Sequence, residues 1–503
     1  MQESIVNKLK PHQVLPARHL TKLLRTGLSC IDGSKCGAGK TYVTSAVLKE
    51  LERPTLVVVP KVAEHEWEKA AKHFGVKFSL CSYDLARAGS SPYGHWDNPL
   101  PRGEKNDNGD SIRTTYVCQS CQRQLDLGRS SVRDRSSGQM EPCYCHPLGI
   151  HCVVAKKKRW NYGKFHWHPG IKLLVFDEAH RCSAPRSLNA EMMVAAKRQG
   201  IQVMMLTATP ACTPLNMRAI GYVLDLHNDV NFYPWARRHG CGTLPGLRGF
   251  HWTIGRDRQV EVMDKVKAQI FPMRGVALDY KDIPGFPERT VDPVLYNFKD
   301  ADRMQSIYDQ MQEQVEKIEK RGLDYVSNAL TDRLIMRQRI EMLKVPIMAE
   351  LAEDYVAKGM SVALFVNFTD TLEELCSLLK TRCVIRGATS AKEREQRKLN
   401  IDRFQSDDEP IIIVNNKAGR ESLSLHDING IRARMGLVSL PESAVELIQL
   451  LGRLHRTGGM SPAFYKLILA KGTVESRIYP RVMANKNNVE ALTDADIDPL
   501  RKD

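Results

Sequence analysis

A glycine-rich stretch near the N-terminus has the residue types that bind phosphate. The stretch "SKCGAGKT" spans residues 34–41. It fits the pattern G-x-x-x-x-G-K-[ST] except that Ser34 stands at the first glycine position. Glycines let a backbone bend tightly and approach phosphate oxygens, while the lysine and the hydroxyl would contact the phosphates and Mg²⁺. The alternative is an ordinary turn that opens a helix. The predicted nucleotide contacts are Gly37, Ala38, Gly39, Lys40 and Thr41.

Two adjacent carboxylates close an apolar run further along the chain. The run "KLLVFDE", residues 172–178, ends in Asp177 and Glu178. An aspartate in this position can hold Mg²⁺, and the glutamate can orient and deprotonate an attacking water. A solvated acidic turn is the alternative, but it does not explain why a buried strand should end in both carboxylates. A second run, "QVMMLTATP", brings the hydroxyls of Thr207 and Thr209 to the end of another apolar strand.

Two arginines three residues apart lie near the C-terminus, in "QLLGRLHRTG" at residues 449–458. Residues three apart share one face of a helix, so we expect Arg453 and Arg456 to point the same way. Arginine stays charged and its planar fork matches phosphate oxygens. An isolated surface pair is the alternative.

The elements that would position these residues read as an α/β fold with a parallel sheet. Short apolar runs lead into the motif-like turns and alternate with helical patterns. One helix is expected in "HEWEKAAKHFG", ending at Gly75. No run of about 18 apolar residues occurs, and the first residues have no secretory signature. The predicted strands are residues 55–60, 172–178, 202–210, 361–368 and 410–416.

In this order, the motifs resemble those of superfamily 2 helicases and translocases. "LKPHQ" resembles the adenine-reading motif, with Gln13 in the base-specifying place. "VVVPKVAEHEW" and "NKAGRESLSLHD" resemble nucleic-acid motifs. The arginine segment matches Q-x-x-G-R-x-x-R, which implies that Arg456 acts as an arginine finger on the γ-phosphate, with Arg453 beside it. "LKPHQ", "LTATPACTPLN" and "HRTG" are similar to the Swi/Snf-type branch, and the short chain resembles its small viral or phage members. Ser34 and Ser422 depart from the family pattern. The implied nucleic-acid or coupling residues are Lys61, Thr207, Thr209, Ser424 and His426.

The resemblance implies two RecA-like domains in tandem, with the ATP site assembled between them. We expect domain 1 over residues 1–280, a linker over 281–293, and domain 2 over 294–503. A further expectation is an insertion within domain 1 over residues 97–155. It begins in a stretch rich in Gly, Pro, Asn and Asp, and it contains a cluster of cysteines.

The cysteine cluster predicts a structural Zn²⁺ site. "CQSC" has the C-x2-C spacing that presents two thiolates to one ion, and "CYCH" follows about twenty residues later. A polar loop gains stability from such a metal because it has little core of its own. His146 could replace Cys145, and reduced structural cysteines are the alternative to a metal. The arginines between the two motifs would contact phosphate or form a solvated basic loop. The predicted ligands are Cys118, Cys121, Cys143 and Cys145.

Composition agrees with a nucleic-acid partner. The 503 residues carry a formal net charge of +15, which fits a polyanion. The sequence therefore predicts an ATP-dependent translocase or helicase acting on duplex or branched DNA, with DNA favoured over RNA. The alternatives are a strand-separating DNA or RNA helicase, a nucleic-acid-binding scaffold switched by ATP, and a zinc-dependent interaction module carried on a motor. We expect a monomer that is neither membrane-bound nor secreted, in the cytoplasm of a bacterial host or another reducing compartment.

Overall fold

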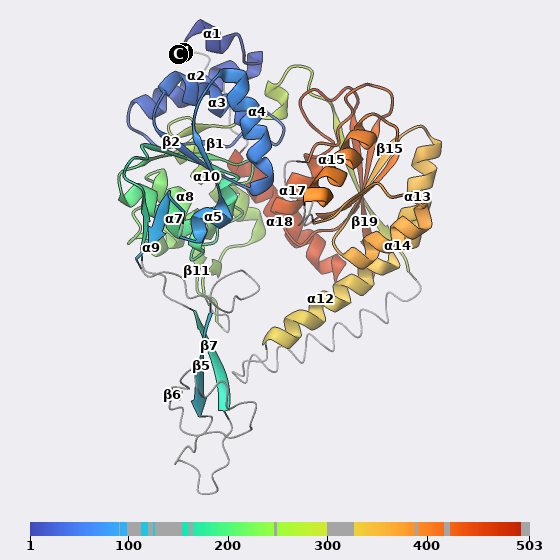
Figure 1. Ribbon diagram of the computed structural model, residues 1–503. Coiled ribbons are helices and arrows are strands. Elements are labelled where there is room, and N and C mark those ends of the chain that lie inside the picture. The colour runs from blue at the N-terminus through green and yellow to red at the C-terminus, as the bar shows by residue number, and fades with distance from the viewer. Residues whose placement is uncertain are drawn as a thin grey trace, which may run out of the picture.

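The computed structural model describes ten stretches of the chain. They are residues 1–89, 91–97, 112–118, 124–125, 153–159, 164–245, 249–298, 326–387, 391–416 and 423–493. Two α/β units make up most of them, and they lie side by side (Figure 1).

Six parallel strands form the sheet of domain 1, in the order β13-β1-β10-β9-β2-β3. Its central strands are entirely or almost entirely buried because helices cover both faces, which explains their unbroken apolar sequences. This confirms the predicted parallel sheet. The strands are β1 (Cys30–Asp32), β2 (Thr55–Val59), β3 (Ser79–Ser82), β9 (Leu173–Asp177), β10 (Gln202–Leu206) and β13 (Gly275–Val276).

The helices of domain 1 follow from local sequence signals. The predicted helix end at Gly75 is present: α4 ends there, and Gly75 has a φ of +62°, a conformation that suits glycine. Helix α7 begins after Ser187, whose hydroxyl accepts a hydrogen bond from the N–H of Ala190. The α-helices are α1 (Glu3–Val6), α2 (Pro11–Arg25), α3 (Lys40–Leu51), α4 (Glu64–Phe74), α5 (Tyr83–Arg87), α7 (Leu188–Arg198), α8 (Arg218–Val223), α9 (Phe232–Arg238) and α10 (Arg256–Ile270). Short 3-10 turns are η1 (Lys61–Ala63), η2 (Ala179–Cys182), η3 (Pro214–Met217) and η4 (Tyr280–Asp282).

The expected insertion leaves and rejoins domain 1 through a small antiparallel pair, β4 (Gly94–Trp96) with β8 (Phe165–Trp167). Beyond it, β5 (Ile112–Cys118) pairs antiparallel with β6 (Gln124–Leu125) and β7 (Val153–Arg159), and these strands extend away from the first sheet (Figure 1). A separate pair is β11 (Cys241–Gly242) with β12 (His251–Trp252). Of the four predicted zinc ligands, Cys121, Cys143 and Cys145 lie outside the described residues, and the side chain of Cys118 is not described either.

Domain 2 has a second sheet of six parallel strands, in the order β14-β19-β18-β15-β17-β16. Strands β15 and β18 are buried along their whole length, as expected for the centre of a parallel sheet. The strands are β14 (Arg289–Tyr296), β15 (Ser361–Val366), β16 (Val384–Ile385), β17 (Ile411–Asn415), β18 (Arg434–Ser439) and β19 (Ala463–Ala470). The helices are α12 (Val326–Leu343), α13 (Val345–Ala357), α14 (Thr369–Leu379), α15 (Ala391–Gln405), α17 (Ala444–Leu451) and α18 (Glu475–Thr493).

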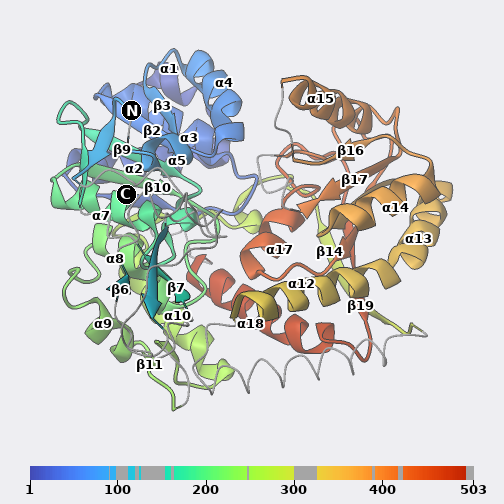
Figure 2. The same cartoon turned by 60° about the horizontal axis from the view of Figure 1, so that its bottom comes forward.

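The boundaries differ from the expected ones in two places. Residues 289–293, placed in the linker, form the first part of β14, because their backbone pairs with β19 along the edge of the second sheet. Helix α18, assigned wholly to domain 2, packs against α10 of domain 1 (Figure 2). Asn488 on α18 donates to Gln259 Oε1 at 3.2 Å, and Leu492 belongs to the core of domain 1. In the described part of the chain, no helix is both long enough and apolar enough to cross a membrane.

Candidate functional site

The glycine-rich stretch forms a loop between β1 and α3. Gly37 has a φ of +83° and Gly39 a φ of +87°, which side chains other than glycine rarely adopt. The Lys40 ammonium donates to the carbonyl oxygens of Ser34 (2.7 Å) and Lys35 (3.2 Å), so it reaches back across the loop. Because α3 begins at Lys40, its N-terminal dipole points at the same place. The loop therefore has the features of an anion cradle.

Ser34 stands where the phosphate-loop pattern has glycine. Its contacts hold the loop in place. Its side chain is buried, and its hydroxyl accepts a hydrogen bond from the N–H of Leu278 at 3.0 Å. Its own N–H donates to Asp32 Oδ1 at 3.0 Å. These contacts tie the loop to β1 and to the segment after β13. The serine thus replaces glycine without disturbing the glycines nearer to the phosphate-binding end.

Gln13 lies directly against this loop. Its Oε1 accepts from the N–H of Lys10 at 3.0 Å, and its Nε2 donates to the carbonyl of Ala38 at 3.4 Å. A Cβ at Gly39 would come within 2.1 Å of that nitrogen, so only glycine fits there while Gln13 keeps its position. The structure brings the proposed adenine residue to the edge of the cradle; adenine recognition itself stays a prediction.

The two carboxylates sit at the C-terminal end of β9. Trp67, fully buried, donates its indole N–H to Asp177 Oδ2 at 2.8 Å, and the N–H of Glu178 donates to Oδ1 at 2.9 Å. Burial and the neighbouring charge of Glu178 raise the pKa of Asp177. Glu178 has a φ of +51°, a strained conformation for a residue with a side chain. Such strain is found at functional sites, where the surrounding structure maintains it.

His180 joins three of the motifs. Its Nδ1 lies 3.2 Å from Glu178 Oε2 and 3.4 Å from the Thr207 hydroxyl, and its Nε2 lies 3.4 Å from Gln449 Nε2. Burial would raise the pKa of Glu178, but the hydrogen bond and charge of His180, with Lys40 and Arg453, outweigh it and lower that pKa. Glu178 is therefore held as a carboxylate, which is the form that can accept a proton.

The predicted coupling residues of the third motif are both buried. Thr207 accepts a hydrogen bond from the N–H of Thr209 at 3.1 Å and contacts His180. Among the described residues, the Thr209 hydroxyl has no hydrogen-bond partner. Thr207 therefore contacts the carboxylate site through His180, and its burial keeps it from contacting a ligand at the surface.

The two arginines do not lie on a helix, contrary to our expectation. Helix α17 ends at Leu451 with Gly452 as its C-cap, and the following turns carry both arginines. Arg453 is buried, and it donates to the carbonyl of Leu423 at 3.3 Å. Arg456 donates to the Ser424 hydroxyl at 2.7 Å. Burial lowers the pKa of both guanidinium groups, against the attraction of Glu178. Neither arginine forms an ion pair within the described part of the chain.

This arginine segment meets the glycine-rich loop across the two domains. The Thr457 hydroxyl donates to the carbonyl of Gly37 at 2.6 Å. A Cβ at Gly37 would come within 3.1 Å of Arg456 Cα, and a Cβ at Gly452 within 2.7 Å of Cys36 Cβ. The two domains therefore share one site, with lysine, carboxylates and arginines gathered around the loop.

The remaining predicted residues lie in different surroundings. Lys61 is exposed, directly after β2, where a ligand can reach it. Ser424 instead accepts from Arg456, so it belongs to the arginine cluster in this arrangement. His426 is partly buried, and burial, with the charges of Arg456 and Arg434, lowers its pKa to about 4. Residues 417–422, including Ser422, lie outside the described part of the chain.

Four residues at this site were not among the predicted site residues: Trp67, His180, Gln449 and Thr457. Trp67, Gln449 and Thr457 stood inside the quoted motifs, and His180 lies two residues after Glu178, so each was close to a sequence signal. Their contacts are what single them out.

Metal ligands can be judged from donor chemistry. Mg²⁺ takes hard oxygen ligands, and the Thr41 hydroxyl and the Asp177 carboxylate, at the start of α3 and the end of β9, are of that kind. No group of three or more His, Cys, Asp or Glu side chains suited to holding a metal occurs among the residues whose positions are described. The side chains of the four predicted zinc ligands are not among those described.

Three comparisons with known proteins each found a likeness. Residues 344–458 match the family model described as "Helicase conserved C-terminal domain". A protein of Acanthamoeba polyphaga mimivirus, described as a "Putative ATP-dependent RNA helicase", is 26% identical over 506 residues, covering 98% of this chain and 84% of that protein. Among solved structures, S. cerevisiae Dbp5 bound to RNA and ADP BeF3 is 12% identical with a TM-score of 0.40, covering 95% of this chain and 92% of that one. The match shows that the second α/β unit contains a helicase C-terminal domain, and the site that it shares with the glycine-rich loop is that of an NTPase.

Proposed function

We propose that this enzyme hydrolyses ATP in the site between its two domains and uses the cycle to separate or remodel RNA strands. The observation that carries the proposal is the junction of the two domains at the glycine-rich loop, where Thr457 contacts Gly37. A site shared by two domains changes when they move apart. Nucleotide binding and release can therefore drive a relative motion of the domains.

Each catalytic residue has one part in this reaction. Lys40 binds the β and γ phosphates, and the backbone of Gly37, Ala38 and Gly39 surrounds them. Thr41 and Asp177 would hold Mg²⁺, which neutralises charge on the phosphate oxygens when it is bound.

Glu178 orients water and accepts its proton, which its lowered pKa permits. Arg453 and Arg456 stabilise the negative charge that develops on the transferring phosphoryl group. Gln13, against the edge of the loop, would contact the adenine.

RNA is the substrate that the comparisons favour. The Swi/Snf-type resemblance of the sequence favoured duplex DNA, but the full-length mimivirus relative is described as an RNA helicase. This supports the alternative that the sequence left open, a strand-separating helicase. We propose that nucleic acid crosses both domains, with Lys61 among its contacts, and that binding is salt-dependent because phosphates dominate it. We propose that the working form is a monomer in a reducing compartment.

Zinc stays part of the proposal. The antiparallel register of β5 and β7 pairs Cys118 with Val153, the residue after Cys152 in the sequence, so the backbone brings the two ends of the cysteine-rich segment together. This supports a Zn²⁺ site built from Cys118, Cys121, Cys143 and Cys145 with His146 as an alternative ligand. A tetrahedral site of four thiolates would be structural, because it leaves no open position for a substrate.

An ATPase assay with four nucleic acids tests the function. ATP turnover is measured with single-stranded RNA, single-stranded DNA, duplex DNA and forked DNA, with unwinding of a labelled RNA duplex in parallel. We expect the largest stimulation with RNA. Stimulation by duplex DNA alone would restore the translocase interpretation, and no stimulation by any of the four would refute both.

A further inference from the structure

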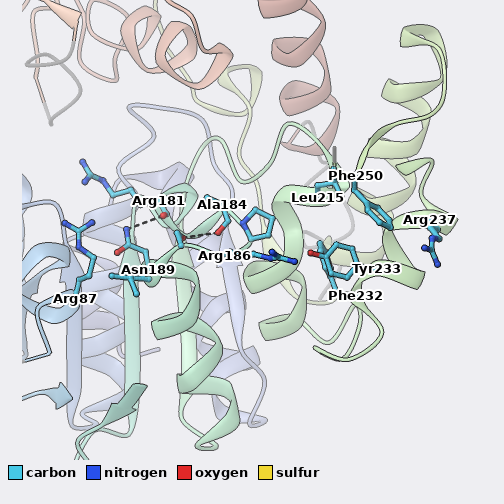
Figure 3. A pocket seen from close by; sticks show the side chains of 14 residues that line it. Arg87, Arg181, Ala184, Arg186, Asn189, Leu215, Phe232, Tyr233, Arg237 and Phe250 are labelled. Carbon is cyan, nitrogen blue, oxygen red and sulfur yellow. Dashed lines mark hydrogen bonds between the residues drawn. The ribbon is translucent and has the colours of Figure 1, made fainter. Parts of the chain in front are cut away.

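A large pocket in domain 1 lies outside the nucleotide site. Its volume is about 1200 Å³. Small-molecule sites usually measure roughly 300–1,000 Å³, so a segment of a polymer fits it better than one small ligand. The walls come from α5, η2, the start of α7, η3 and α9, with Gly249 and Phe250 beyond them (Figure 3). We call it the arginine pocket.

Among the described residues that line the arginine pocket, all the charged side chains are arginines: Arg87, Arg181, Arg186 and Arg237. Arg87 pairs with the exposed Asp84, which is not a lining residue. The guanidinium of Arg181 lies over the Tyr83 ring at 5.7 Å, and in the described part of the chain it forms no ion pair. A cavity lined by guanidinium groups and by no carboxylate calls for an anionic ligand, and arginine matches phosphate geometry well.

Aromatic rings stand beside these charges. The centroids of Tyr233 and Phe250 are 4.8 Å apart with an angle of 52° between the rings, and both side chains are partly exposed. The guanidinium of Arg237 lies over Phe250, 5.2 Å from its centroid. Figure 3 shows these three side chains together at one end of the pocket. Rings next to guanidinium groups suit a ligand that alternates flat bases with phosphates, since bases stack on both.

The same elements connect the pocket to the catalytic centre. Arg181 is in η2, three residues after Glu178, and the Asn189 side chain donates to its carbonyl at 3.3 Å. Leu215 follows the segment that carries Thr207 and Thr209. A ligand in the pocket therefore touches η2 and η3, which follow the residues of the catalytic centre closely in the chain.

We propose that the arginine pocket binds a single-stranded segment of nucleic acid as a second contact, away from the cleft between the domains. This rests on the proposed function, because the ligand is the same polymer. The phosphates lie against the four arginines, and a base stacks at Tyr233 and Phe250.

Two neighbouring arginines of α9 provide a matched test. Arg237 and Arg238 are both exposed, but only Arg237 lines the pocket. Binding of a fluorescent single-stranded RNA 20-mer to the full chain is measured by anisotropy as a function of salt. Arg237→Glu should raise Kd about tenfold and flatten the salt dependence, and Phe250→Ala should raise Kd about fivefold through lost stacking. Arg238→Glu should remain within about threefold of the unsubstituted protein, since it leaves only the long-range attraction weakened. ATP turnover without nucleic acid should be the same in all four proteins.

Several results separate the pocket from the motor. If RNA stimulates the ATPase but Arg237→Glu and Arg238→Glu bind it equally, the pocket proposal is wrong and the proposed function stands. If the unsubstituted protein neither binds nucleic acid nor responds to it, both are wrong. Competition by polyglutamate as effective as that by RNA would assign the pocket to an acidic protein instead. Photo-crosslinking of thiouridine-labelled RNA gives a readout that needs no substitution: we expect a crosslinked peptide containing Tyr233, and its absence where other peptides crosslink contradicts the pocket.

Discussion

The hydrogen bond from Thr457 to Gly37 offers the sharpest test of the shared site. It joins the segment that carries the arginines to the phosphate-binding loop, and its length is 2.6 Å. Thr457→Val keeps the shape of the side chain and removes the hydroxyl. Thr457→Ser keeps the hydroxyl and removes a methyl group, so it is the matched control.

The size of the effect follows from the contact. A partly buried hydrogen bond between neutral groups contributes about 0.5–1.5 kcal/mol net, which corresponds to roughly a two- to tenfold change in the population of the joined arrangement. The bond crosses between domains rather than stabilising either sheet. We therefore expect kcat/KM for ATP to fall by roughly that factor in Thr457→Val, with little change in the unfolding temperature of the protein.

Steady-state ATP hydrolysis with saturating RNA, over a range of ATP concentrations, measures this. Thr457→Ser should stay close to the unsubstituted enzyme. Equal activity of all three proteins would mean that the joined arrangement is not the one that hydrolyses ATP. If Thr457→Val lowered both ATP hydrolysis and the unfolding temperature by a large amount, the contact would stabilise the fold rather than the catalytic arrangement.

Four further outcomes follow from the site. Glu178→Gln should lower turnover about a hundredfold or more while binding of a fluorescent ATP analogue persists, because the amide cannot accept the proton. Ser34→Gly should lower the free energy of unfolding by about 1 kcal/mol, measured in urea, since Leu278 loses its acceptor, yet change turnover little. The proposed Mg²⁺ site needs an ionised Asp177, so kcat/KM should be lost as pH falls through the raised pKa of this carboxyl group. Trp67→Phe removes the indole N–H that favours the ionised carboxylate, so the loss of kcat/KM should move to higher pH. Purified protein should contain one zinc per chain by atomic emission, and Cys118→Ser should remove it.

Much of the fold could be predicted from the sequence because buried parallel strands leave a strong signal. Within the predicted runs, residues 173–176 and 362–366 are apolar throughout, since helices cover both faces of each sheet. The carboxyl ends of parallel strands meet at one edge, so the residues after them, such as Asp177 and Thr207, had to lie close together. The order of the motifs along the chain, which resembles the family pattern, then predicted that Arg453 and Arg456 face Asp177 and Thr207 from the second domain.

The errors arose where contacts distant in sequence decide the structure. Nothing local in residues 289–293 distinguishes an edge strand from a linker. Strand β14 pairs on one side only, and none of its side chains is buried, so the segment has no apolar run. The arginines were placed on a helix by their spacing, but Gly452 ends α17 one residue before them. Asn488 is buried where it donates a hydrogen bond to Gln259, 229 positions earlier in the chain. The spacing of apolar residues along a helix cannot indicate such a distant contact.

His180 shows how these distant contacts give the site its logic. One imidazole lies within 3.4 Å of Glu178, of Thr207 and of Gln449, and the last of these belongs to the other domain. Separation of the domains removes Gln449 and the charge of Arg453 from the neighbourhood of Glu178. Since Arg453 and His180 both lower the pKa of Glu178, the carboxylate is best held in its ionised form when the domains are joined. If Glu178 is the general base and Arg453 and Arg456 stabilise the phosphoryl group, as proposed, all three are in place together only when the domains are joined, and we expect hydrolysis in that arrangement.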